Sequence, residues 1–217
     1  MQDQNDLNKD YSIREEIFNS ISHGMGVLLS IAGLAVLIVM AVSRGTVWHV
    51  IGFAVFGSTL IILYLFSTLY HSFRSPRLKN LFARLDHAAI FILIAGTYTP
   101  FTLTTLRGSL GWTIFAVIWT LAIFGVVLRS IYLRRFRKLS VVLYVGMGWL
   151  VVFALREIFI HLPLQSFIFL LTGGLFYTIG VIFYAWRRLP FNHAIWHVFV
   201  LLGSIFHFFS VLQSLHS

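Results

Sequence analysis

The sequence predicts an all-α integral membrane protein built as a bundle of seven transmembrane helices. The first observation is composition: 59% of the 217 residues are hydrophobic and only 11% are charged, whereas a soluble protein carries about 25% charged residues. The second is length, because a span takes about 20 apolar residues and this chain therefore has room for seven spans and no separate soluble domain. The third is that charged residues, glycine or proline interrupt the apolar sequence at regular intervals.

Seven apolar runs follow one another along the chain, at residues 22–42, 48–71, 84–105, 110–128, 139–155, 164–186 and 192–214. The polar segment before the first run lacks the basic region of a secretory signal, and the run itself is too long for one. We therefore expect the first run to remain as a membrane anchor. The predicted organisation is a polar N-terminal tail at residues 1–20 and a single transmembrane domain at residues 21–217.

Basic residues gather in alternate connections, and this pattern predicts the orientation because Lys and Arg are retained on the cytoplasmic side. Arg44, Arg107 and Arg156 lie in the first, third and fifth connections. The other thirteen basic residues lie in the tail and in the second, fourth and sixth connections: Lys9, Arg14, Arg74, Arg77, Lys79, Arg84, Arg129, Arg134, Arg135, Arg137, Lys138, Arg187 and Arg188. The count predicts a cytoplasmic N-terminus, an extracytoplasmic C-terminus and a location in the cell membrane.

Histidines near the cytoplasmic ends of the spans form a candidate metal site. His193 and His197 are four residues apart at the start of the seventh span, which places both imidazoles on one helix face. His71, at the cytoplasmic end of the second span, is the best third ligand. The chain has no cysteine, so a metal must be held by nitrogen or oxygen ligands. Three histidines are typical of a zinc site that keeps a fourth position open.

Asp86 and Ser67 are expected at the same depth as these histidines. Asp86 opens the third span, where it could orient a water or act as a base, or could simply complement the helix dipole as a first-turn acid. Ser67 lies one turn before His71 and could donate to a substrate oxyanion or bond back to its own helix. Three further polar residues precede the first span at the same face, and their roles are left open: Glu16, Asn19 and His23.

Several ligand classes fit the sequence less well. Retinal is excluded because no lysine lies in the seventh span to form a Schiff base, and bis-histidine haem requires histidines that face each other across a cavity. The net charge of +9 is spread between apolar runs, which favours anionic lipid headgroups over nucleic acid. Membrane lipids are the expected partners, and the pattern indicates neither a protein partner nor an oligomeric state.

Four separated motifs together resemble the hemolysin III family, the bacterial branch of the progestin and adiponectin receptor (PAQR) superfamily. The motifs are Glu16-x-x-Asn19-x-x-x-His23-Gly24, Ser67-x-x-x-His71, Asp86-His87 and His193-x-x-x-His197. The resemblance implies a seven-helix bundle in a bacterial membrane, with an intracellular N-terminus and zinc near the cytoplasmic face. It implies His71, His193 and His197 as the zinc ligands, with Asp86 and Ser67 close to the metal-bound water.

The resemblance leaves functions of different classes open. The wider superfamily implies a metal-dependent lipid amide hydrolase, so we expect a zinc hydrolase that acts on a lipid amide or ester at the cytoplasmic face. The family name implies instead a membrane-lytic, pore-forming protein, although uniformly apolar spans offer no polar stripe to line a pore. A receptor-like protein is a third possibility. In that case, or in a purely structural role, the zinc would only clamp the second, third and seventh spans together.

Overall fold

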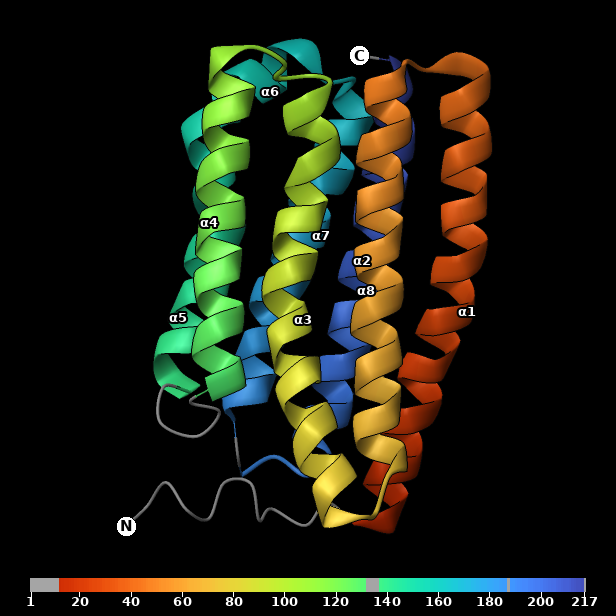
Figure 1. Ribbon diagram of the computed structural model, residues 1–217, viewed down its shortest axis with the longest axis vertical. Coiled ribbons are helices and arrows are strands. Elements are labelled where there is room, and N and C mark those ends of the chain that lie inside the picture. The colour runs from red at the N-terminus through yellow and green to blue at the C-terminus, as the bar shows by residue number, and fades with distance from the viewer. Residues whose placement is uncertain (1–11, 132–136, 187, 217) are drawn as a thin grey trace.

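The computed structural model describes residues 12–131, 137–186 and 188–216, and every regular element in these ranges is a helix (Figure 1). Seven helical segments within them are long and apolar enough to cross a membrane. The predicted fold class is therefore confirmed. The orientation of the bundle in the membrane is not part of this result and stays a prediction.

Six of the seven spans are each formed by one α-helix. These helices are α1 (Ile13–Arg44), α2 (Val47–Ser72), α3 (Pro76–Leu103), α4 (Ser109–Ile131), α7 (Leu164–Ala185) and α8 (Asn192–Gln213), the last of which runs into a 3-10 turn, η3 (Ser214–His216). The fifth span is divided into α5 (Arg137–Gly148), a 3-10 segment η2 (Trp149–Ala154) and α6 (Leu155–His161).

Two helices begin well before the apolar runs that predicted them. Helix α1 begins at Ile13 because Ser12 forms a capping box with Glu15, in which Glu15 N–H donates to Ser12 Oγ (3.2 Å) and Ser12 N–H donates to Glu15 Oε2 (3.0 Å). Helix α3 begins with Pro76, whose fixed φ suits a first helical position. Residues 1–11 of the predicted tail lie outside the described residues, and α1 continues without a break past residue 20.

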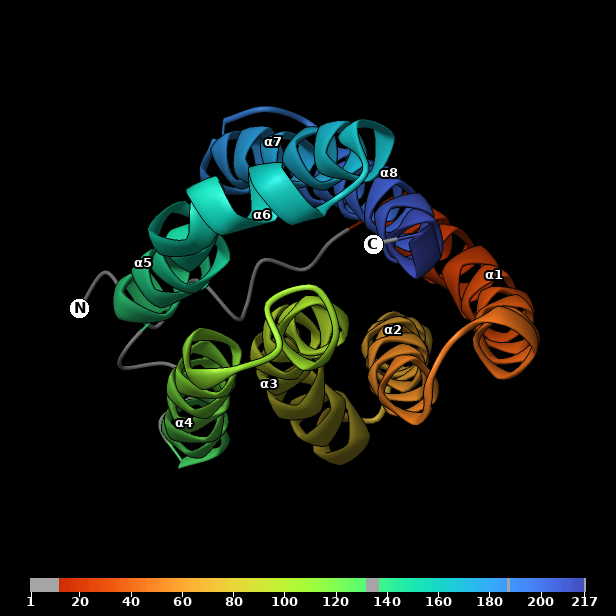
Figure 2. The ribbon, with the colours of Figure 1, turned by 90° about the horizontal axis from the view of Figure 1, so that it is seen from above.

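The spans form a ring in chain order when seen along the bundle (Figure 2). Helix α8 closes the ring because it packs against both α7 and α1. The start of α1, the connection between α2 and α3, and the connection into α8 lie at one end of the bundle, and the C-terminus lies at the other (Figure 1). Residues that are distant in the sequence therefore meet at the end that carries the connections predicted to be cytoplasmic.

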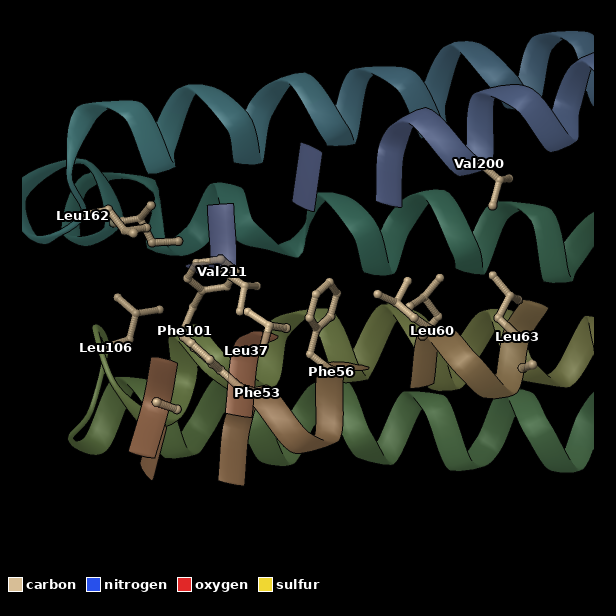
Figure 3. Close-up of a cluster of buried hydrophobic side chains, with 14 of the residues drawn as sticks. Leu37, Phe53, Phe56, Leu60, Leu63, Phe101, Leu106, Leu162, Val200 and Val211 are labelled. Carbon is tan, nitrogen blue, oxygen red and sulfur yellow. The ribbon is translucent and has the colours of Figure 1, made fainter. Parts of the chain in front are cut away.

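A buried apolar cluster joins α1, α2 and α3 to the fifth span and α8 (Figure 3). Leu37 from α1, Phe53 and Phe56 from α2, and Val211 from α8 are each fully buried in it. Large apolar side chains also face outward, as a chain surrounded by lipid requires; Phe153, for example, is 83% exposed. Close packing of α1, α2 and α8 fixes the positions of the polar residues that these helices carry.

Candidate metal centre

Three buried histidines from two helices converge at one end of the bundle. His71 lies in the last turn of α2, and His193 and His197 lie in the first two turns of α8. His193 Nε2 is 3.2 Å from His71 Nε2 and 3.0 Å from His197 Nε2. One ring nitrogen of each histidine lies within 4.8 Å of the other two. The structure thus brings together the three side chains that the sequence singled out as ligands.

The three ring nitrogens fit a tetrahedral metal ion. Zinc binds imidazole nitrogens at 2.0–2.1 Å, so two such ligands in a tetrahedron are separated by about 3.3–3.4 Å, close to the two distances above. His193 Nε2 carries at most one proton and can donate to only one of its two neighbours. A cation between the three nitrogens would satisfy all of them at once, and an imidazole set suits zinc.

The second nitrogen of His71 faces a carboxylate. Glu16 Oε2, from the first turn of α1, is 2.5 Å from His71 Nδ1. Because the carboxylate accepts, Nδ1 carries the proton and the Nε2 lone pair is directed at the other two histidines. Asn19 Nδ2 is 3.5 Å from the same Nδ1, which is too far for a strong hydrogen bond.

Asp86 lies deeper in its helix than the sequence indicated. Because α3 begins at Pro76, Asp86 is in the third turn and not the first, and no acid occupies the first turn. The interpretation of Asp86 as a first-turn acid is therefore wrong. The residue is buried (8% exposed) and lines a cavity together with His193 and His197.

Ser67 lies beside Asp86 at the same cavity. Its Oγ is buried and donates to no carbonyl of its own helix; Asp86 is the group that interacts with it. The alternative in which Ser67 bonds back to the carbonyl of its own helix is therefore not what the structure has. A hydroxyl has one proton and two lone pairs, so Ser67 Oγ can also contact a bound molecule or water in the cavity.

The cavity extends from this cluster into the bundle. It has a volume of about 170 Å³ and follows α3 from Asp86 to Thr102, a distance of roughly 24 Å at 1.5 Å per residue. Its walls are largely apolar and come from spans on all sides of the ring, among them Leu63, Ile90 and Val200. Such a space fits a hydrocarbon chain whose polar end lies at the histidines.

The sequence left His23 without a role and treated Arg129 only as a loop charge. His23 stacks on His197 with ring centroids 3.6 Å apart, and neither of its ring nitrogens has a hydrogen-bond partner among the described residues. Arg129 was placed in a connection, but it lies in the last turn of α4 and is only 2% exposed. Its charge interacts with Asp86.

The comparisons with known proteins point to one family. A family model described as "Haemolysin-III related" matches residues 11–208. The chain is 52% identical over 200 residues to "Hemolysin-3" of Bacillus cereus, covering 92% of this chain and 91% of that protein. It is 46% identical over 202 residues to "Hemolysin-3 homolog" of Bacillus subtilis (strain 168), covering 93% and 95%. It is 26% identical over 208 residues to "Monocyte to macrophage differentiation factor" of Homo sapiens, covering 93% and 85%.

Proposed function

The chain belongs to the haemolysin-III related family of multi-pass membrane proteins, and on that premise we propose that it is a zinc-dependent hydrolase of a lipid amide or ester. One observation carries the proposal: the buried cluster of His71, His193 and His197 adjoins the polar end of a long apolar cavity that Asp86 also lines. A soluble substrate would not need such a cavity, whereas an acyl chain would fill it.

The residues at this end of the cavity would have different roles: metal binding, proton transfer and stabilisation of the developing negative charge. His71, His193 and His197 would hold the zinc ion. When bound, zinc supplies a Lewis acid that polarises a carbonyl group and makes a water molecule nucleophilic near neutral pH. Asp86 would accept a proton from the attacking water and return it to the leaving amine or alcohol. The hydroxyl of Ser67, which also lines the cavity, would donate to the substrate carbonyl oxygen as negative charge develops there.

Arg129 supports this division of roles. A carboxylate that shuttles a proton must start ionised, and burial alone disfavours the ionised form. Arg129 supplies a buried positive charge that acts on Asp86. The apolar cavity walls exclude water from the acyl chain and strengthen the electrostatic interactions at the polar end.

The cytoplasmic side is the proposed location of the cluster. The end of the bundle that holds the three histidines also carries Arg74, in the connection between α2 and α3, and Arg77 and Lys79, in the first turn of α3. Retention of basic loops in the cytoplasm would place the cluster at the inner leaflet. Basic residues there would also attract anionic lipid headgroups.

The names of the two Bacillus relatives, both called hemolysins, favour a second candidate function, membrane lysis. A lytic protein needs either a polar channel or an assembly that opens one. The cavity described above is lined mainly by apolar side chains, which supports a lipid site more than a water-filled pore.

Zinc content and lipid hydrolysis, measured on the same purified samples, test the hydrolase. We expect about one zinc per chain in the wild type, and a loss of most of it in the His193→Ala/His197→Ala double variant. We expect release of fatty acid from at least one member of a panel of lipid amides and esters. Asp86→Ala should retain zinc and lower the rate by about 10²–10⁴-fold. A zinc-loaded wild type that releases no fatty acid from any substrate of the panel contradicts the proposal.

A further inference from the structure

The first turn of α1 contacts three other helices through two adjacent glutamates. Glu16 reaches His71 of α2 through Oε2 and forms an ion pair with Lys79 of α3 through Oε1. Glu15 Oε1 accepts a hydrogen bond from the backbone N–H of Phe191, directly before α8, at 3.1 Å. These contacts link α1 to both helices that carry the candidate ligands.

Glu16 determines which nitrogen of His71 is available to a metal. A histidine ligand commonly donates its other ring N–H to a carboxylate, which fixes the tautomer and the ring orientation and raises the basicity of the ligand nitrogen. The 2.5 Å contact between Glu16 and His71 has this geometry. Lys79 holds the second carboxylate oxygen, so that the side chain of Glu16 is fixed at both of its oxygens.

Glu15 fixes the start of the helix that carries the other two histidines. Phe191 has a positive φ of 56°, a conformation that a large side chain rarely adopts. The strain is compensated where the surroundings over-determine the backbone, and the hydrogen bond from Phe191 N–H to Glu15 is one such restraint. His193 follows two residues later. The positions of both α8 histidines therefore depend on the backbone conformation of Phe191.

We propose that the first turn of α1 is a positioning element of the metal centre, in which Glu16, held by Lys79, orients His71, and Glu15 anchors the start of α8. The inference rests on the proposed metal site and adds to it residues that bind no metal themselves. It also explains why α1 extends beyond its apolar run. The polar first turn of α1 lies beside the end of α2 and the start of α8, the two helices that carry the candidate ligands.

Replacement of Glu by Gln at each of the two adjacent positions separates the effect of the charge that faces His71 from the effect of side-chain packing. In Glu16→Gln the carboxylate that faces His71 becomes a neutral amide, and we expect zinc affinity to fall about 10- to 100-fold. In Glu15→Gln the single amide oxygen can keep the hydrogen bond from Phe191 N–H only by giving up the one from Ser12 N–H. The carboxylate that faces His71 is untouched, and we expect affinity within about threefold of the wild type. Lys79→Met should weaken zinc binding by an intermediate amount, because it frees Glu16 without altering His71.

The measurement is a zinc titration of the full-length protein in detergent against a chelator of known affinity, together with the visible absorption spectrum of the Co²⁺-loaded protein. A changed Co²⁺ spectrum in Glu16→Gln but not in Glu15→Gln supports a role in ligand geometry. Thermal unfolding of the metal-free variants controls for folding, and Lys79→Met carries the test if Glu16→Gln does not fold.

Wild-type affinity in both Glu16→Gln and Lys79→Met overturns the positioning role and leaves the metal centre intact. A wild type that binds neither zinc nor Co²⁺ overturns the metal centre itself, and the positioning role with it.

Discussion

The hydroxyl of Tyr98 acts as a backbone hydrogen-bond partner for Val151. It accepts the N–H of Val151 at 2.8 Å and lies 2.9 Å from the carbonyl oxygens of both Met147 and Gly148, which share its single proton. These backbone groups belong to the junction where α5 gives way to the 3-10 segment η2. In a bilayer a helix can be interrupted only where other protein groups satisfy the freed backbone, and Tyr98 of α3 provides that group.

Removal of this hydroxyl should destabilise the fifth span. We expect Tyr98→Phe to lower the free energy of unfolding by about 1–3 kcal/mol, because it leaves a part-buried N–H and a carbonyl without a partner. Thermal unfolding in detergent measures the effect. Tyr144→Phe is the matched control: it loses only a hydrogen bond to the His87 carbonyl inside α3, which keeps its helical partner. An equal loss of stability in the two variants would contradict the role assigned to Tyr98.

Two adjacent glycines of α7 should respond in opposite ways to alanine. A Cβ on Gly173 would lie 2.2 Å from Cδ2 of His207, whose Nε2 is held 3.1 Å from the Leu170 carbonyl oxygen and cannot easily move. We expect Gly173→Ala to cost about 1–3 kcal/mol. A Cβ on Gly174 meets nothing within 4 Å, and Gly174→Ala should be neutral or stabilising by up to about 1 kcal/mol. The same melting temperature in both variants would show that His207 yields to the added methyl group.

The sequence was sufficient for the spans and for the shared depth of the histidines, and the reason is physical. Hydrophobicity determines what crosses a membrane, so apolar runs located the spans to within a few residues at most ends. Helix direction then alternates, which puts His71, at the end of one span, at the same depth as His193 and His197, at the start of another. That these helices bring the three side chains together did not follow from the alternation and was expected from the family resemblance.

Helix ends outside the apolar runs could not be predicted in the same way. The early start of α3 moved Asp86 from the first turn to the third, and the end of α4 at Ile131 enclosed Arg129. Pro76 sets the start of α3, and hydropathy reports neither this signal nor the packing that buries Arg129. The break in the fifth span depends on Tyr98, a residue about 50 positions earlier in the sequence, so no local pattern could reveal it.

His23 is expected to be dispensable for metal binding although it stacks on a candidate ligand. The group whose nitrogens converge contains His71, His193 and His197 but not His23. His23→Phe preserves an aromatic ring against His197 and removes both ring nitrogens. We therefore expect about one zinc per chain in His23→Phe and little in His197→Phe, as measured by elemental analysis of protein washed free of loose metal. Loss of zinc from His23→Phe would instead make His23 a ligand.

The orientation can be tested with reporters fused at the two ends of the bundle. With a cytoplasmic N-terminus, alkaline phosphatase fused after His216 should be active and a fluorescent protein fused there should be dark. Insertion of either reporter at Ser75, in the connection between α2 and α3, should give the opposite result. These outcomes follow from the retention of basic loops in the cytoplasm. Bright fluorescence at the C-terminus together with active phosphatase at Ser75 would place the histidine cluster outside the cell.

Liposome leakage distinguishes the hydrolase from a lytic protein. We expect no release of trapped dye from anionic liposomes containing the wild type beyond that from protein-free liposomes, because the cavity walls are apolar and a water-filled path needs polar ones. Any release caused by lipid hydrolysis should stop after chelation of the metal and should be absent with His71→Ala. A pore has no such requirement. Dye release that persists in both the chelated protein and His71→Ala would therefore favour lysis over the hydrolase.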